Sequence, residues 1–176
     1  MSDQIAQSVA SLGEEEAIRA ILAEVCAITG MGFSAVAYVS EDRWIACQVD
    51  DRIQFGLEPG EELEVRKTIC DEIRRDGEAI MIDDTDADHD WWSHPVPVLY
   101  GFHSYVSLPI TLDDGAFFGT LCAIDPEPRP EPIRRRLDRL EELARQVASI
   151  IGSRLTESAP ARDAIPLTRS RPPTAQ

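Results

Sequence analysis

Hydrophobic residues follow two periodicities along this chain, and each predicts a different element. Over residues 14–29 they recur every three or four positions, which predicts an amphipathic helix that Gly30 ends. Residues 33–39 and 44–49 are instead rich in β-branched and aromatic side chains, which predicts two strands. The polar loop 40–43 joins them, so we expect a hairpin.

The second half of the chain repeats this pattern. It contains a predicted short helix over 64–75, a short strand over 79–82 and two further strands, 104–110 and 116–124. The last two strands flank Asp113-Asp114-Gly115, which favours a tight hairpin turn. Hairpin connections imply an antiparallel sheet, and helices near both ends of the chain suit packing against one of its faces.

We therefore expect one α+β domain over residues 14–155. Segment 83–103 has no regular pattern and is expected to cover the second face of the sheet, and segments of this kind are usually functional. Residues 1–13 are mostly polar or small and predict a flexible leader. Residues 156–176 are rich in Ser, Pro, Ala and Arg without apolar periodicity, which predicts a disordered tail.

The last predicted helix carries an apolar seam. Its residues are separated alternately by four and three positions: Ile133, Leu137, Leu140, Ala144, Val147 and Ile151. Heptad spacing is typical of helices that pair, so we expect a homodimer through this helix. The same stripe could also form the core of a single chain, and the two roles do not exclude each other.

The charge balance limits the partners. The 176 residues include 17 Lys+Arg and 32 Asp+Glu, which gives a formal net charge of -15. Nucleic acids and anionic membrane surfaces require clustered basic residues, so we expect neither as a partner. The N-terminal residues show no signal-peptide pattern, and no apolar run approaches the roughly 20 residues that span a bilayer. A cytoplasmic location is expected.

The cysteines and aspartates are candidates for metal or redox groups. None of the four cysteines lies in a CxxC pair, which argues against zinc and iron–sulfur sites. Residues 83–90 are acidic but lack the glycine and final glutamate of a calcium-binding loop, so we expect them to cap turns and helix ends without a metal. Cys70 stands at a predicted helix start, where a thiol pKa is lowered, so a redox role is an alternative to packing. Cys122 is expected in the core.

Five short motifs are distinctive: EDRWIA at residues 41–46, TICDEI at 68–73, IDDTDAD at 82–88, YVSLPI at 105–110 and GTLCAID at 119–125. Together they resemble motifs of the GAF domain, in the subtype common in bacterial sensor histidine kinases and diguanylate cyclases. The last motif is nearly identical to that subtype's Gly-Thr-Leu-Cys-x-Ile-Asp strand. The resemblance covers roughly residues 14–155.

This resemblance implies a six-stranded antiparallel sheet, with helices on one face and a ligand pocket under loops on the other. Domains of this family usually sense small molecules, dimerise through flanking helices and signal to an output domain. Two departures matter: the subtype's His is replaced by Asp71 or Glu72, and its strand Gly by Ser107. Residues 156–176 show no output-domain pattern, so the chain is either a free-standing sensor or a fragment.

The candidate pocket combines aromatic side chains with a few polar groups, as ligand sites do. Its predicted residues are Tyr38, Cys70, Trp91, Trp92, Tyr100, Phe102, His103, Tyr105, Ser107 and Cys122. The alternative is that the rings fill the space under the loops and leave no cavity. His94 and His103 have no partners in the sequence that would support acid–base catalysis.

We expect no thiol catalysis at this pocket. The related free methionine sulfoxide reductases use cysteines on the pocket-covering loops, whereas residues 83–121 contain none. The sequence therefore predicts neither an enzyme nor a covalently attached bilin. A non-covalent small molecule or chromophore stays open, and the cofactor is unknown.

Three functional hypotheses follow. The first is a dimeric GAF sensor that binds a small organic ligand non-covalently and signals through its helices, as in two-component signal transduction. The second is a ligand-free dimeric module that binds a basic partner protein or a kinase. The third is a redox sensor that acts through Cys70.

Overall fold

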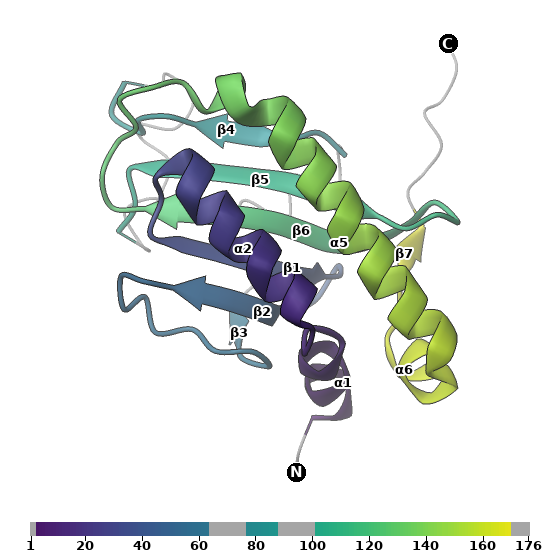
Figure 1. The fold of residues 1–176 in the computed structure, drawn as a ribbon. Helices are drawn as coiled ribbons and strands as arrows, with labels where there is room; N and C mark the ends of the chain where they lie inside the picture. Colours follow the sequence, from purple (N-terminus) through teal and green to yellow (C-terminus); the bar gives the residue numbers. More distant parts are fainter. Residues whose placement is uncertain (1–2, 64–76, 88–100, 170–176) are drawn as a thin grey trace.

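An antiparallel sheet forms the centre of the structure, a computed structural model that describes residues 3–63, 77–87 and 101–169. Six strands lie in the order β3-β2-β1-β6-β5-β4 (Figure 1). They are β1 (Phe33–Val39), β2 (Trp44–Asp51), β3 (Glu62–Leu63), β4 (Ile80–Ile82), β5 (Ser104–Thr111) and β6 (Ala116–Asp125). β1 pairs with β2, and β5 with β6, as the predicted hairpins, so the expected α+β fold is confirmed. The predicted helix 64–75 lies outside the described residues.

Two long helices cover one face of this sheet (Figure 1). The first, α2 (Glu16–Thr29), ends at Gly30, whose φ of +73° lies in the left-handed region that glycine tolerates. The second, α5 (Leu137–Glu157), follows the 3-10 turn η2 (Ile133–Arg136). Both helices bury their apolar stripes against the sheet in one continuous core. None of the helices in the three described ranges is long and apolar enough to cross a membrane.

The predicted seam of α5 faces the sheet of its own chain. Leu137 is partly buried against the core, and the other members are fully buried in it: Ile133, Leu140, Ala144, Val147 and Ile151. An amphipathic helix must bury its apolar face, and here the sheet covers it. A homodimer therefore stays a prediction, and it would have to use residues other than these.

The N-terminal residues differ from the expected flexible leader. Residues Gln4–Leu12 form helix α1, and its N-cap Asp3 accepts hydrogen bonds from the backbone N–H groups of Ile5 and Ala6. Ala6, Val9 and Leu12 lie three residues apart and are all buried in the core on the helical side. The sequence prediction was wrong because such a short stripe is inconspicuous among polar residues.

The C-terminal residues also differ from the expected disordered tail. Helix α6 (Ala159–Ala164) follows α5 after a break at Ser158, because Pro160 has no N–H with which to continue α5. The chain then buries Ile165 and forms the short strand β7 (Thr168–Arg169), which pairs with β6. The Tyr38 hydroxyl donates a hydrogen bond to the carbonyl of Pro166. We call residues 158–169 the C-terminal strap.

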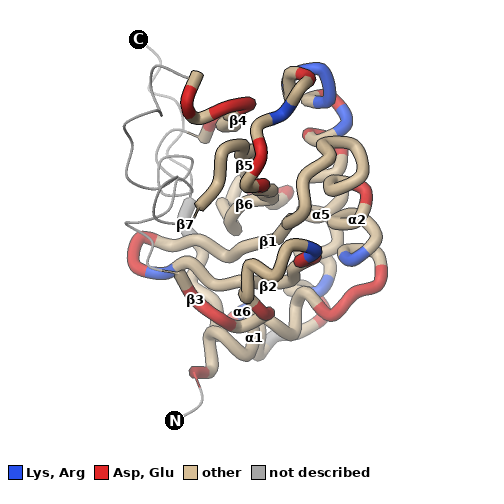
Figure 2. Tube along the Cα trace, turned by 90° about the vertical axis from the view of Figure 1, so that its left-hand side faces the viewer, with Lys and Arg blue, Asp and Glu red and all other residues tan. Residues whose placement is uncertain are grey.

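Charged residues are distributed unevenly over these elements. Strand β1 has none, and β6 has only Asp125 at its end. In Figure 2 these central strands are tan, while acidic and basic residues lie on the helices, the outer strands and the connecting loops. Both faces of the central sheet are therefore apolar, which is typical of a sheet that is covered on both sides.

Candidate functional site

The strands present a second apolar face on the side opposite α2 and α5, which we call the loop face. On β1, the side chains of Ala35, Ala37 and Val39 belong to a core on this face, whereas Val36 and Tyr38 belong to the core under the helices. This alternation is the normal pleat of a β-strand. The loop face is therefore a separate layer with its own packing.

Two rows of small side chains cross the middle of the loop face. Residues directly opposed in an antiparallel sheet point to the same side, so pairing of β2, β1, β6 and β5 brings these residues together. We call the set the small-residue floor: Ala46, Ala37 and Thr120 in one row, and Ala35, Cys122 and Ser107 in the next. Each of them is between 0% and 5% exposed.

Larger side chains border the floor at both ends. Beyond the row of Ala35, the opposed residues are Phe33, Ile124, Tyr105 and Ile82. The ring of Phe102 stacks on that of Tyr105, with centroids 5.4 Å apart. Beyond the row of Ala37, the opposed residues are Val39, Trp44 and Leu63. Side chains on the loop face are therefore small in the middle of β1 and β6 and large toward both ends of these strands.

Trp44 brings a polar group to this border. Its side chain is buried in the loop-face core, yet its indole Nε1 has no hydrogen-bond partner within the described part of the chain. Indole N–H is only a donor, and leaving a buried donor unpaired costs about 1–3 kcal/mol. A ligand with a carbonyl or carboxylate oxygen would supply the missing acceptor.

The structure brings together some of the predicted pocket residues. Phe102, Tyr105, Ser107 and Cys122 all lie on the loop face. The prediction for Tyr38 was wrong in its position: it packs under the helices, because it alternates with Ala37 along β1. Four other candidates lie outside the described residues: Cys70, Trp91, Trp92 and Tyr100.

His103 lies at the edge of this layer rather than over the floor. Its Nδ1 is 2.8 Å from the carbonyl oxygen of Pro126, and its Nε2 is 3.6 Å from the carboxylate of Asp86. Both ring nitrogens therefore face the ends of neighbouring loops. This arrangement fits a structural histidine.

Of the floor residues, the sequence predicted only Ser107 and Cys122 as site residues, and it did not predict Trp44. The signal was the alternation of small and large residues in 33–39 together with the register of the hairpins. Register depends on which residues pair across strands, and β2 has a bulge opposite Val36 and Ala37 that shifts it. The pattern within one strand could not show that the small residues line up.

Two cysteines under the helices are protected thiols. Burial raises the pKa of Cys47 to about 12, and its Sγ lies 3.2 Å from the carbonyl oxygen of Val9. Burial also raises the pKa of Cys26, whose Sγ lies 3.4 Å from the Ser34 hydroxyl. Since the thiolate is the reactive form, neither is suited to redox sensing. Cys122 is a core residue as predicted, and Cys70 lies outside the described residues.

The described aspartates of the acidic stretch cap the backbone. Asp83 accepts a hydrogen bond from the N–H of Ile133 at 2.7 Å, and Asp84 accepts one from the N–H of Asp86 at 3.0 Å. These contacts confirm the capping role predicted for both residues. Across the described ranges, no group of three or more His, Cys, Asp or Glu residues is placed to hold a metal ion.

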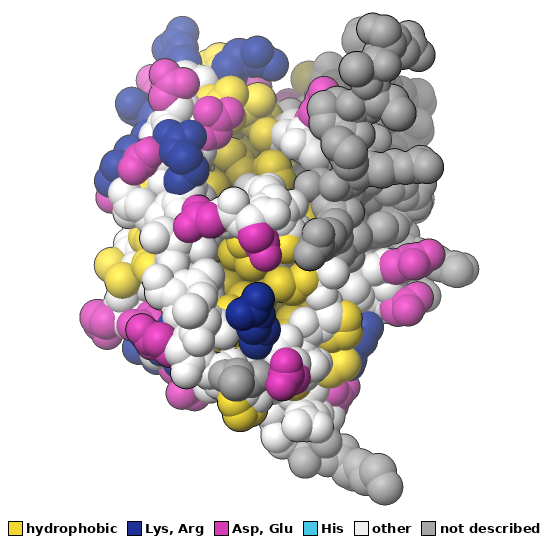
Figure 3. Space-filling view, turned by 90° about the vertical axis from the view of Figure 1, so that its right-hand side faces the viewer, with side chains coloured by type: hydrophobic (Ala, Val, Ile, Leu, Met, Phe, Trp, Pro, Cys, Tyr) yellow, Lys and Arg dark blue, Asp and Glu magenta, His cyan; other side chains and the backbone are white. Residues whose placement is uncertain are grey.

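Two surface grooves lie on the helical side. One, of about 410 Å³, runs between α5 and the end of β5, where Leu108, Pro109, Ala144 and Ala148 line it. In Figure 3 hydrophobic side chains form a band on this side of the molecule. The other, of about 380 Å³, lies between α1, α5 and α6. Neither contains a residue predicted to bind ligand, so the loop face stays the better candidate site.

Comparison with known proteins agrees with this architecture. The family model for the GAF domain matches residues 13–151. The structure resembles the blue-light absorbing form of the Thermosynechococcus elongatus PixJ GAF domain, with 14% identity, a TM-score of 0.63 and coverage of 92% of this chain and 96% of that one. It also resembles the GAF domain of a two-component sensor histidine kinase from Bacillus halodurans (13%, TM-score 0.61, coverage 81% and 97%).

A third similar structure is the GAF-B domain of DevS from Mycobacterium smegmatis, with 18% identity, a TM-score of 0.58 and coverage of 80% of this chain and 94% of that one. No curated protein matches the chain. The TM-scores show a shared fold, whereas identities this low leave the ligand open.

Proposed function

The chain belongs to the GAF domain family, and we propose that it is a sensor that binds a small organic ligand non-covalently on the loop face. GAF domains of this kind are sensory or regulatory modules and are typically non-catalytic. The ligand and its position are the new elements of the proposal. The observation that carries them is the small-residue floor between two borders of larger side chains.

The chemistry of the loop face suggests what such a ligand would look like. Alanine methyl groups and the Cys122 side chain favour a flat apolar body. Hydroxyl groups of Ser107 and Thr120 lie among them, and the N–H of Trp44 has no acceptor among the residues that the structure describes. An aromatic or conjugated molecule with a carbonyl or carboxylate oxygen at one end fits these groups best.

The test is a thermal-shift screen of the purified protein against metabolites and chromophores, combined with its absorbance spectrum. Ala37→Val places two extra carbon atoms on the floor, whereas Ala123→Val makes the same change on the helical side of the adjacent strand. Both residues are 0% exposed, so both variants should lose stability by roughly 1–3 kcal/mol through overpacking. Only Ala37→Val should reduce the shift caused by a ligand.

Equal ligand response in both variants would place binding away from the floor. A second function, a ligand-free scaffold, is favoured by the complete burial of the floor residues. It predicts no thermal shift with any compound but retains dimerisation, which light scattering after size exclusion would detect. We propose a homodimer and a signalling partner such as a kinase in either case.

A further inference from the structure

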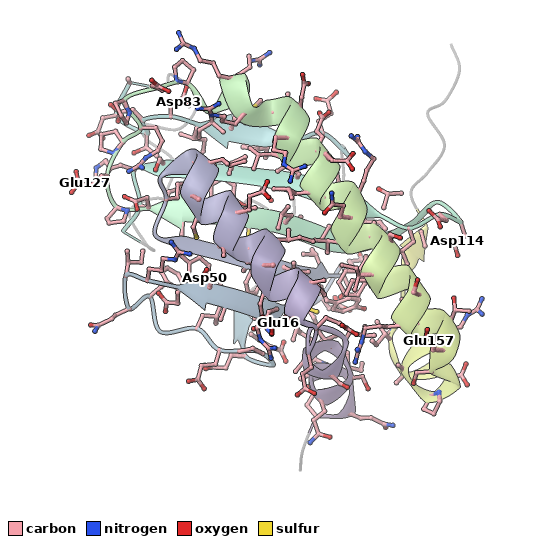
Figure 4. All side chains as sticks on the ribbon, in the orientation of Figure 1. Glu16, Asp50, Asp83, Asp114, Glu127 and Glu157 are labelled. Atoms are coloured by element: carbon pink, nitrogen blue, oxygen red, sulfur yellow. The ribbon has the colours of Figure 1, made fainter. Side chains whose placement is uncertain are left out.

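At one end of the sheet, hydrogen bonds connect the loop face to both long helices. The group consists of Asp83, His103, Asp125 and Arg129, which we call the junction. Figure 4 shows its position: the labelled Asp83 and Glu127 lie at this end of the sheet, and Asp114 lies at the other. The junction residues come from three segments that are far apart in the sequence.

Each of these segments enters the junction directly from the loop face. Asp83 follows Ile82, His103 follows Phe102, and Asp125 follows Ile124. All three preceding residues belong to the loop-face core. A shift of these apolar side chains would therefore move the backbone from which the junction residues project.

Asp125 and Arg129 tie this backbone to the end of α2. The Asp125 carboxylate accepts hydrogen bonds from the N–H groups of Gly32 and Glu127, both at 2.8 Å, and from the Arg129 guanidinium at 3.0 Å. Arg129 also donates to the carbonyl of Gly30 at 2.6 Å, where α2 ends. The Asp125 and Arg129 side chains are only 11% and 12% exposed, so water competes little for these bonds.

Asp83 ties the same backbone to the start of the C-terminal helix. Neither η2 nor α5 has a side-chain cap from its own N-cap residue. Asp83, 50 positions away, supplies the side-chain cap: its carboxylate accepts a hydrogen bond from the N–H of Ile133 at 2.7 Å. The backbone carbonyl of Asp83 also accepts a hydrogen bond from the N–H of Arg129 at 2.8 Å. The first turn of this helical segment is therefore held by a residue of the loop-face layer.

His103 joins the three segments to one another. Its carbonyl accepts the N–H of Thr85 at 2.8 Å, and its own N–H donates to the carbonyl of Asp125 at 3.0 Å. The neighbouring Ser104 hydroxyl donates to the carbonyl of Glu127 at 2.8 Å. The segments therefore behave as one hydrogen-bonded unit with contacts to both helices.

We propose that the junction transmits changes in the loop face near Phe102 to the first turn of η2–α5, with Asp83 as the positioning residue. The biological meaning rests on the proposed function, since a ligand would be the natural source of such changes. The physical coupling can be tested without a ligand. It needs only a mutation that loosens the loop face at a chosen place.

Phe102→Leu and Phe117→Leu form a matched pair of such mutations. Both residues are 4% exposed and belong to the loop-face core, but Phe117 lies at the other end of β6, away from the junction. Amide hydrogen exchange of residues 133–140 is the measurement. Phe102→Leu should accelerate it by roughly tenfold, equivalent to about 1.4 kcal/mol of local opening. Phe117→Leu should leave it unchanged.

The same pair is then measured in an Asp83→Ala background. If Asp83 carries the effect, Phe102→Leu no longer changes exchange at 133–140 beyond what Asp83→Ala does alone, a non-additivity typical of coupled sites. Asp114→Ala is the matched control, since Asp114 also caps a backbone N–H, that of Ala116 at 2.9 Å, at the opposite end of the sheet.

Additive effects of Phe102→Leu and Asp83→Ala would overturn the proposal, as would equal effects of the two phenylalanine variants. If Asp83→Ala fails to fold, Asp83→Asn replaces it. Asn keeps an acceptor oxygen, so the coupling to Phe102→Leu should survive in that background, and its disappearance would overturn the role of Asp83 as an acceptor. These results do not depend on ligand binding, so they are distinguishable from failure of the ligand screen.

Discussion

Asp125→Ala is the substitution whose cost the structure defines best. The carboxylate accepts three hydrogen bonds, from Gly32, Glu127 and Arg129. Each bond to a charged group is worth about 1.5–3 kcal/mol alone, but three bonds that share one carboxylate are not additive. Removing one partner of a buried ion pair costs about 3–5 kcal/mol, because the other charge stays buried.

The slight exposure of the Asp125 and Arg129 side chains, 11% and 12%, lets some water reach the guanidinium. We therefore expect the free energy of unfolding to fall by about 3–4 kcal/mol, in the lower part of the range for buried pairs. Urea unfolding followed by circular dichroism measures it, and the slope with denaturant should not change.

Asp50→Ala is the control for this prediction. Asp50 also pairs with an arginine, Arg52 at 3.1 Å, but the pair is exposed, at 24% and 51%. Surface pairs contribute about 0–1 kcal/mol, so this variant should stay close to the wild type. If Asp125→Ala costs no more than Asp50→Ala, the argument that the Asp125 carboxylate holds the end of α2 is refuted.

Three further predictions concern groups outside the junction. Tyr38→Phe removes the hydroxyl bond to Pro166 and should cost about 1 kcal/mol while making the C-terminal strap more sensitive to limited proteolysis; unchanged proteolysis would count against it. Cys47, with its pKa raised by burial to about 12, should resist iodoacetamide at pH 8 in the folded protein and react in urea; mass spectrometry of the labelled peptide detects either outcome. The hydrogen bond from Arg43 lowers the pKa of the Asp3 carboxyl below its ordinary value of 3.8. The contribution of Asp3 to capping α1 is therefore complete above pH 3.8 and is lost as the pH falls through the lowered pKa. NMR of the first amides of α1 should show this loss before the sheet unfolds.

The sequence predicted the elements whose periodicity is long and regular. Spacing predicts the helix over 14–29, whereas composition and turn residues predict the strands 33–39 and 116–124. The pairing within each hairpin follows from the short polar turns. The face to which Tyr38 points could not be predicted. Alternation along a strand shows which residues point to opposite faces of the sheet, but it does not show which face the helices cover.

The junction could not be predicted either, since its bonds join residues far apart in the chain. Asp83 and Ile133 are 50 positions apart, and Gly32 and Asp125 are 93 apart. In the sequence, Asp83 is one aspartate among several in an acidic stretch. The C-terminal strap was missed for a related reason: it is rich in Ala and Pro without apolar periodicity, and the buried Ile165 that anchors it has no periodic neighbours.

The burial of the α5 seam changes the route by which this domain could signal. If the heptad seam faced a partner helix, ligand binding could change the packing of a dimer. In this structure the seam side chains instead pack against the sheet of their own chain. The start of the helical segment is different, because the N–H of Ile133 donates to the Asp83 carboxylate rather than to a local cap. A change in the loop face can therefore alter the first turn of this segment, at Ile133, without disturbing the rest of the seam. Since one carboxylate caps that turn, the capped and uncapped states of the turn should differ in free energy by about 1 kcal/mol. A ligand with a modest difference in affinity for the two states can shift this equilibrium.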